Sequence, residues 1–223
     1  MINNNIIFID FDSTFIKLET LDELAKLVLK NDKERNLKIK QITEITNQAM
    51  SGNINFSKAL NLRLQLLKIN KTDVVKITNH LSKSISESIN SNIDLIRLIS
   101  ENIWIVSGGF KDIIAPIVKN FGIKKSKILA NEFIYNKYNQ VIGCNEQNDL
   151  YKSKGKISAI KNLKLPGNKI MIGDGYTDYE VFKHGAVNTF IYYGENIFRE
   201  NVANLSKYKA ESFKDVLKIL ETL

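Results

Sequence analysis

The 223-residue chain contains one cysteine, two prolines and two histidines. A single cysteine, Cys144, excludes an internal disulfide bond and any metal site built only from cysteines, and it fits a reducing compartment. The histidines, His80 and His184, lack the paired spacing of metal ligands, so both are interpreted as structural. No proline-rich linker, internal repeat or low-complexity tract divides the chain.

Long apolar runs are missing as well. None approaches the roughly 20 residues that a membrane-spanning helix needs. The first residues, Met1-Ile2-Asn3-Asn4-Asn5, do not form a charged leader followed by an apolar segment, so no signal peptide is expected. These absences predict a cytoplasmic protein that does not bind membranes. Its apolar fraction of 43% and charged fraction of 25% are ordinary for a globular protein with a sizeable core.

Basic residues outnumber acidic ones by 32 to 24, which gives a formal net charge of +8. Such an excess is compatible with binding of nucleic acid or small anions. The lysines are scattered and form no basic face interleaved with aromatic residues, so no nucleic-acid partner is expected. Residues 17–85 hold 13 basic and 7 acidic side chains, a net charge of +6 that could attract an anionic substrate.

Alternation of strands and helices predicts an α/β fold with a doubly wound parallel sheet. The first strand is the apolar run Ile6-Ile7-Phe8-Ile9, typical of a buried parallel strand. The other strands are expected at residues 103–106, 169–172 and 189–192, with a hairpin formed by 133–135 and 141–142. Helices are expected at residues 91–101, from 110 to about 121 and at 154–163. Two more are expected, one from the loop that ends at residue 178 to about 183, and one after 212.

A run of helices without a strand interrupts this pattern. Thr20 and Glu23 have the spacing of a capping box at the start of the first helix. Asn55 can cap a third helix, and further helices are expected at about 33–50 and 72–83. We therefore predict two domains: an α/β core of residues 1–16 and 86–223, and a small helical-bundle cap of residues 17–85.

Three predicted strands end in polar residues. Asp10 and Asp12 follow the first, Ser107 follows the second, and Asp174 and Asp178 follow the third. An isolated Asp-x-Asp is more often a capped strand end. Because parallel strands bring their carboxyl ends to one edge of a sheet, however, these clusters can converge where ligands bind in such folds.

The chemistry of these side chains suits phosphoryl transfer. Three carboxylates can hold Mg²⁺, and a carboxylate can attack phosphorus to form an aspartyl-phosphate. A hydroxyl, a lysine and the amides of a glycine loop can hold the phosphoryl oxygens. Lys154 and Lys156 lie in a loop just before the third cluster, and Gly108 and Gly109 allow a close backbone approach at a helix start.

Four motifs in order resemble the haloacid dehalogenase superfamily, and specifically its phosphoserine phosphatases. The resemblance covers nearly the whole chain, and it predicts a Rossmann-like core with a small helical cap. The matching segments are Asp10-Phe11-Asp12-Ser13-Thr14, Ser107-Gly108-Gly109-Phe110, Lys154-Gly155-Lys156 and Gly173-Asp174-Gly175-Tyr176-Thr177-Asp178.

The resemblance assigns a role to each motif. Asp10 would be the nucleophile, and Asp12 the general acid that then becomes the base. Mg²⁺ would be held by the side chains of Asp10 and Asp174 and the backbone carbonyl of Asp12, and Asp178 and Thr177 would orient the water around it. The phosphoryl group would be held by Ser107, Gly108, Gly109 and Lys154, since Lys154 rather than Lys156 fits the motif spacing.

In the cap, the resemblance implies that Glu19 contacts the substrate ammonium and Arg63 its carboxylate, beside an apolar wall of Met50 and Phe56. Each has a simpler interpretation: Glu19 favours a helix N-terminus, Arg63 extends its stem over apolar surface, and Met50 and Phe56 belong to the core.

These residues predict a phosphoserine phosphatase that acts on a small phosphomonoester, as a monomer or a homodimer. Two alternatives stay open. The first is a related phosphatase or phosphotransferase acting on another phosphomonoester. The second is a non-catalytic basic protein that binds nucleic acid.

Overall fold

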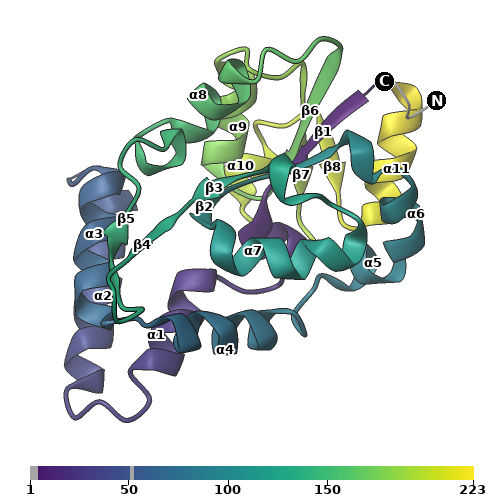
Figure 1. The fold of residues 1–223 in the computed structure, drawn as a ribbon. Helices are drawn as coiled ribbons and strands as arrows, with labels where there is room; N and C mark the ends of the chain where they lie inside the picture. Colours follow the sequence, from purple (N-terminus) through teal and green to yellow (C-terminus); the bar gives the residue numbers. More distant parts are fainter. Residues whose placement is uncertain (1–4, 51–52) are drawn as a thin grey trace.

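Six parallel strands form the centre of the molecule in a computed structural model that describes residues 5–50 and 53–223; the side chains of residues 47, 49 and 50 are outside the description. The strand order is β3-β2-β1-β6-β7-β8, and every neighbouring pair is parallel. The strands are β1 (Asn5–Ile9), β2 (Ile103–Phe110), β3 (Ile128–Asn131), β6 (Asn168–Gly173), β7 (Thr189–Tyr193) and β8 (Tyr208–Ala210). The predicted doubly wound parallel sheet is therefore confirmed (Figure 1).

Helices cover both faces of the sheet because successive strand residues point to opposite sides. In β1, Ile7 and Ile9 belong to one buried cluster and Phe8 to another. The first cluster includes residues of α5 (Glu87–Ser91), α6 (Ile93–Leu98), α7 (Lys111–Val118) and α11 (Phe213–Thr222). The second includes residues of α8 (Gly155–Asn162), α9 (Tyr176–Lys183) and α10 (Glu200–Ala203).

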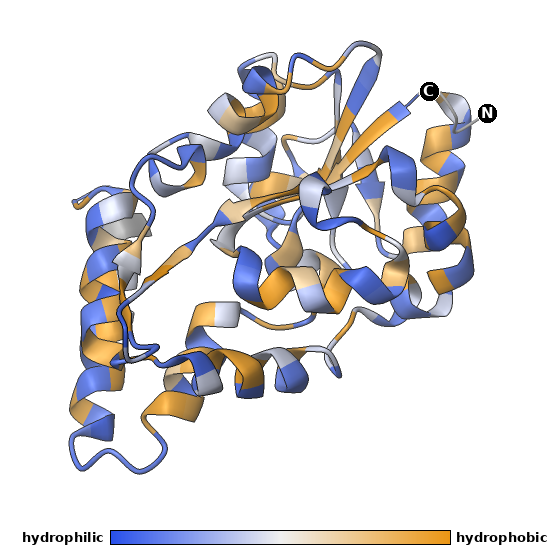
Figure 2. Ribbon diagram, in the orientation of Figure 1, coloured by the Kyte–Doolittle hydropathy of each residue, from blue (hydrophilic) through white to orange (hydrophobic). Residues whose placement is uncertain are grey.

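The insertion after β1 consists of four helices: α1 (Thr20–Val28), α2 (Arg35–Met50), α3 (Phe56–Leu67) and α4 (Lys71–Leu81). Figure 2 shows hydrophobic and hydrophilic residues alternating along α1 and α4, as expected of helices buried on one face. Asn55 caps α3 as predicted, since its side chain accepts from the amide of Lys58 at 2.8 Å. The capping box predicted for α1 is wrong, because Thr20 donates its hydroxyl to Asp12 instead.

A two-stranded antiparallel hairpin of the core packs against the helical insertion. Its strands are β4 (Phe133–Tyr135) and β5 (Val141–Cys144), close to the predicted ranges. The amide of Lys71 donates to the carbonyl of Asn139, and the amide of Val141 donates to the carbonyl of Ile69, both at 2.9 Å. The insertion therefore has backbone contacts with a hairpin that follows β3 in sequence.

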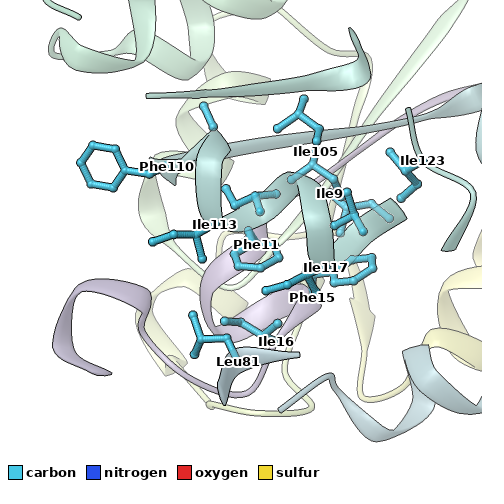
Figure 3. Close-up of a cluster of buried hydrophobic side chains, with 14 of the residues drawn as sticks. Ile9, Phe11, Phe15, Ile16, Leu81, Ile105, Phe110, Ile113, Ile117 and Ile123 are labelled. Carbon is cyan, nitrogen blue, oxygen red and sulfur yellow. The ribbon is translucent and has the colours of Figure 1, made fainter. Parts of the chain in front are cut away.

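The turn after β1 is anchored in the core. Residues Phe11–Phe15 form a short irregular helical turn, η2, in which the Phe11 and Phe15 rings stack with centroids 6.0 Å apart. Figure 3 shows both rings among apolar side chains of α7 and the neighbouring strands. Asp10 and Asp12 flank Phe11 in the sequence, so the burial of the Phe11 ring helps to hold both aspartates at the edge of the sheet.

Two elements differ from the sequence prediction. The helix expected at residues 91–101 is broken at Asn92, which has φ −110° and ψ 23° and separates α5 from α6. The strand β8 was not expected, since it contains only three residues, one of them an exposed lysine. Within the described residues, no helix is long and apolar enough to cross a membrane.

Candidate active site

The nucleophile expected from the sequence lies where β1 ends. The amide of Asp10 donates to the carbonyl of Ile172 on β6 at 2.9 Å, which extends the parallel pairing by one residue beyond Ile9. Asp174 follows β6, so the two neighbouring strands bring both carboxylates to the same edge. Ser13 then takes a left-handed conformation with φ 55°, which turns the chain away from the sheet.

Asp10, Asp174 and Asp178 form a buried acidic cluster in which one oxygen of each lies within 4.8 Å of the others. Gly173 permits this packing, because a Cβ there would lie 2.3 Å from Oδ2 of Asp178. Thr14 donates its hydroxyl to Asp174 at 3.0 Å. Three hard oxygen donors at this spacing fit Mg²⁺, so the predicted metal site has a suitable donor set. This set contains Asp178 in addition to Asp10 and Asp174, the two side chains predicted as ligands.

A lysine lies between two of these carboxylates. Nζ of Lys156 donates to Oδ1 of Asp10 and to Oδ1 of Asp178, each at 2.7 Å. Burial raises the pKa of Asp10, the charge of Asp178 raises it further, and Lys156 lowers it in part. Burial alone would lower the pKa of Lys156, but Asp10 and Asp178 outweigh that effect and raise it. The Lys156 ammonium therefore offsets part of the negative charge of the cluster.

This contact brings Lys156, rather than the predicted Lys154, to the acidic cluster. Lys154 is exposed and precedes α8 with a left-handed φ of 60°. Lys156 lies in the first turn of α8 with a side chain only 11% exposed, and it reaches the nucleophile. Motif spacing alone could not locate the first residue of the helix, so it could not show which lysine reaches the carboxylates, and phosphate binding by Lys154 stays a prediction. Gly155 fixes that start, since a Cβ there would lie 2.2 Å from the carbonyl oxygen of Asp149.

Asp12 lies beside the cluster with its own partners. Its Oδ1 accepts from the amide of Thr20 at 3.0 Å and from the Thr20 hydroxyl. Burial and the negative charge of Glu19 raise the pKa of Asp12 to about 7, although the two bonds from Thr20 lower it. A carboxyl group that titrates near neutrality can both give and accept a proton, as a general acid–base residue must.

The glycine loop, residues 107–109 near the end of β2, is a candidate anion site. Oγ of Ser107 accepts from the amide of Gly109 at 2.9 Å, which leaves the Ser107 hydrogen available to a ligand. A Cβ on Gly109 would lie 3.1 Å from Ser107 Oγ and 3.6 Å from Oδ2 of Asp12, so this loop lies close to Asp12. The ring of Phe56 lies 3.3 Å from where a Cβ on Gly108 would be.

The cap residues are only partly assembled around this loop. Phe56 contacts it, as described. Glu19 accepts from the Ser13 hydroxyl at 2.7 Å, and Arg63 donates to the carbonyl of Ala59 at 3.3 Å. Burial lowers the pKa of Arg63, and among the described residues its guanidinium forms no salt bridge.

Two predicted residues lie further from the cluster or outside the description. Thr177 is exposed in the first turn of α9. Met50 ends α2, and its side chain lies outside the described part of the chain.

Arg199 is a site residue that the sequence analysis missed. Its Nε donates to Oδ2 of Asp174 at 2.9 Å, and its Nη2 lies 3.8 Å from Oε1 of Glu19. Arg199 precedes α10, six residues after the end of β7. Because β7 also ends at the catalytic edge, a basic residue in the loop after it was the available signal.

Comparisons with known proteins agree with this geometry. Human phosphoserine phosphatase is 29% identical over 95% of this chain and 91% of its own length, and the chloroplastic phosphoserine phosphatase of Arabidopsis thaliana is 29% identical over 95% and 70%. The crystal structure of a phosphoserine phosphohydrolase-like protein from Francisella tularensis superposes with a TM-score of 0.81 at 33% identity, covering 96% of this chain and 98% of that one. The family model described as haloacid dehalogenase-like hydrolase matches residues 5–185. The chain therefore belongs to the haloacid dehalogenase-like hydrolases, as its motifs predicted.

Proposed function

We propose that the chain is a Mg²⁺-dependent phosphoserine phosphatase, which hydrolyses O-phospho-L-serine to L-serine and phosphate as the last step of serine synthesis. The observation that carries the proposal is the position of Lys156 between Asp10 and Asp178, 2.7 Å from each, beside the glycine loop. The names of the relatives support the choice of substrate.

In the proposed reaction, a carboxylate oxygen of Asp10 attacks phosphorus and the bond from phosphorus to the serine oxygen breaks. Asp12 gives its proton to that oxygen, so serine leaves neutral at its hydroxyl. Asp12 then accepts a proton from the water that attacks the aspartyl-phosphate, and phosphate leaves Asp10 free again. Ser107, the Gly109 amide and Lys156 hold the phosphoryl oxygens in both steps.

Bound Mg²⁺ would supply positive charge against the phosphoryl group and the acidic cluster. Asp10, Asp174 and Asp178 are the side chains that could hold it, which adds Asp178 to the ligands implied by the resemblance. The backbone carbonyl of Asp12 is included as a Mg²⁺ ligand only because the resemblance to the family implies it.

The amino-acid part of the substrate would lie under the helical insertion. Arg63 suits the carboxylate, because its guanidinium forms no salt bridge among the described residues, although Asp22 and Glu19 are close enough to act on its pKa. Glu19 suits the ammonium group, and Phe56 lies between the insertion and the glycine loop. Unpaired charge is costly in a water-poor site, so two charges of this kind would select phosphoserine over neutral phosphomonoesters.

We also propose that residues 17–85 act as a cap joined to the core by two adjacent linkers. Ile16 and Ile85 form an isolated antiparallel bridge, and the amide of Lys17 donates to the carbonyl of Ser84 at 2.8 Å. The side chain of Asn196 donates to the Ser13 carbonyl at 3.0 Å and to the Ser86 hydroxyl at 2.6 Å. These bonds support domain boundaries near residues 16 and 86. The cytoplasmic location and the monomeric or dimeric state stay predictions.

The experiment that tests the proposed function combines Asp10→Asn with a substrate panel. We expect the variant to lose turnover and keep its fold, as judged by circular dichroism and thermal unfolding. Trapping of the parent enzyme with phosphoserine should place the phosphoryl group on Asp10, by mass spectrometry of the digested protein. Phosphorylation of another residue would contradict the mechanism, and equal kcat/KM for unrelated phosphomonoesters would contradict the substrate.

A further inference from the structure

Asn131 is a fully buried amide at the end of β3, between the two segments that the proposed function uses to hold phosphate. Its Nδ2 donates to the carbonyl of Gly108 at 2.9 Å and to the carbonyl of Leu150 at 3.3 Å. Both partners are carbonyl oxygens, so the amide orientation is fixed by them. Its Oδ1 has no hydrogen-bond partner among the described residues.

The bond to Gly108 is formed where the regular pairing of β2 and β3 is interrupted. β2 and β3 pair at Val106 with Leu129 and again at Phe110 with Asn131. Three residues of β2 therefore face one residue of β3, and the glycine loop bulges out of the sheet. The Asn131 side chain provides a hydrogen-bond donor to a carbonyl of that bulge.

The bond to Leu150 leads to the catalytic lysine. Leu150 lies in a short 3₁₀ turn, Asp149–Tyr151, just before α8. The Asp149 carbonyl packs so closely on Gly155 that a Cβ there would lie 2.2 Å away. Gly155 is the first residue of α8 and Lys156 the second. A displacement of the turn would therefore move the lysine.

We propose that Asn131 is a positioning residue for phosphate binding. Its side-chain amide binds both the glycine loop and the turn before α8, and so fixes the distance between the glycine loop and Lys156. This inference rests on the proposed function. Asn131 does not touch the amino-acid part of the substrate, so its loss should weaken every phosphate ligand by a similar factor, inorganic phosphate included.

Asn148 provides a matched control. It joins the same strand to the same turn, donating to the carbonyl of Ala130 at 2.8 Å and accepting from the amide of Leu150 at 2.9 Å. Unlike Asn131, it has no bond to the glycine loop. Loss of Asn148 should therefore loosen the junction of β3 and the turn without releasing Gly108.

The test compares Asn131→Asp and Asn148→Ala with the parent in the presence of Mg²⁺. Asn131→Asp keeps the side-chain shape and replaces the donor by a group that repels both carbonyls. We expect the Kd of inorganic phosphate, by calorimetry, to rise about tenfold, the effect of losing one good hydrogen bond. KM for phosphoserine and for an aryl phosphate should rise by the same factor, with a smaller change in kcat. Asn148→Ala should lower Tm but change the phosphate Kd less than about twofold.

The outcomes distinguish a failure of the positioning role of Asn131 from a failure of the proposed function. Unchanged phosphate affinity in Asn131→Asp would overturn the positioning role. An equal loss of affinity in Asn148→Ala would overturn it as well, because the effect would then come from loosening the junction of β3 and the turn and not from the bond to Gly108. If Asn131→Asp does not fold, Asn131→Ser carries the same comparison with a smaller polar side chain. A parent enzyme that binds no phosphate and hydrolyses no phosphomonoester would instead refute the proposed function.

Discussion

Replacing Lys156 by methionine removes the positive charge between Asp10 and Asp178 and keeps most of the side-chain volume. The side chains of Lys156, Asp10 and Asp178 are 11%, 12% and 0% exposed, so solvent screens the pair weakly. Removing one partner of a buried ion pair costs about 3–5 kcal/mol in the free energy of unfolding. In a chain of 223 residues this loss should lower Tm by about 10 °C.

The same substitution should affect catalysis. If Lys156 holds a phosphoryl oxygen, its loss should lower kcat/KM by about 10²–10³-fold, as for removal of one donor from an oxyanion site. Mg²⁺ should raise the Tm of Lys156→Met more than that of the parent, because the added cation would replace the missing charge near the carboxylates.

Lys154→Met is the matched control, since the residue is two positions away and exposed. Its free energy of unfolding should stay within about 0.5 kcal/mol of the parent. Thermal unfolding with and without Mg²⁺ and kcat/KM for phosphoserine are to be measured for the parent, Lys156→Met and Lys154→Met. A loss of activity confined to Lys154→Met would refute the reasoning, because the motif spacing would then identify the functional lysine better than the contacts do.

Three further substitutions test separate parts of the site. Glu19→Gln should cost about 1.5–3 kcal/mol in kcat/KM for phosphoserine and far less for an aryl phosphate, which has no ammonium group; equal losses would assign Glu19 a structural role. Asp174→Asn should raise the Mg²⁺ concentration needed for half-maximal activity, and full activity of the parent in excess chelator would exclude the metal. Gly173→Ala should destabilise the fold by about 1–3 kcal/mol or more, because its Cβ would lie 2.3 Å from Asp178; an unchanged Tm would contradict this packing.

The sequence predicted the acidic cluster because parallel pairing alone brings it together. Asp10 and Asp174 follow adjacent strands, and an apolar run followed by aspartate is a signal that needs no knowledge of side-chain packing. The glycine loop was equally accessible, since it lies near the end of β2 on the other side of β1. These predictions depend on the parallel direction of the strands, which the alternation of strands and helices indicates.

Contacts that depend on local competition were not predictable in this way. Thr20 has the spacing of a capping residue, but Asp12 from a preceding turn takes its hydroxyl. Lys154 and Lys156 differ only in which residue starts α8, and a backbone contact with the preceding turn decides that. Arg199 reaches Asp174 across 25 residues of sequence from a loop without a motif. Each outcome was determined by a partner distant in sequence.

The balance of charge at the site gives a physical reason to expect a metal ion. Asp10, Asp174 and Asp178 lie within one small volume, and Asp12 lies beside them. Among the described residues, the cations that form ion pairs with this acidic cluster are Lys156 and Arg199. A phosphomonoester dianion adds two negative charges to a site where burial already raises the pKa of Asp10. The dianion would meet strong repulsion unless more positive charge enters with it, and a divalent ion held by Asp10, Asp174 and Asp178 would supply that charge.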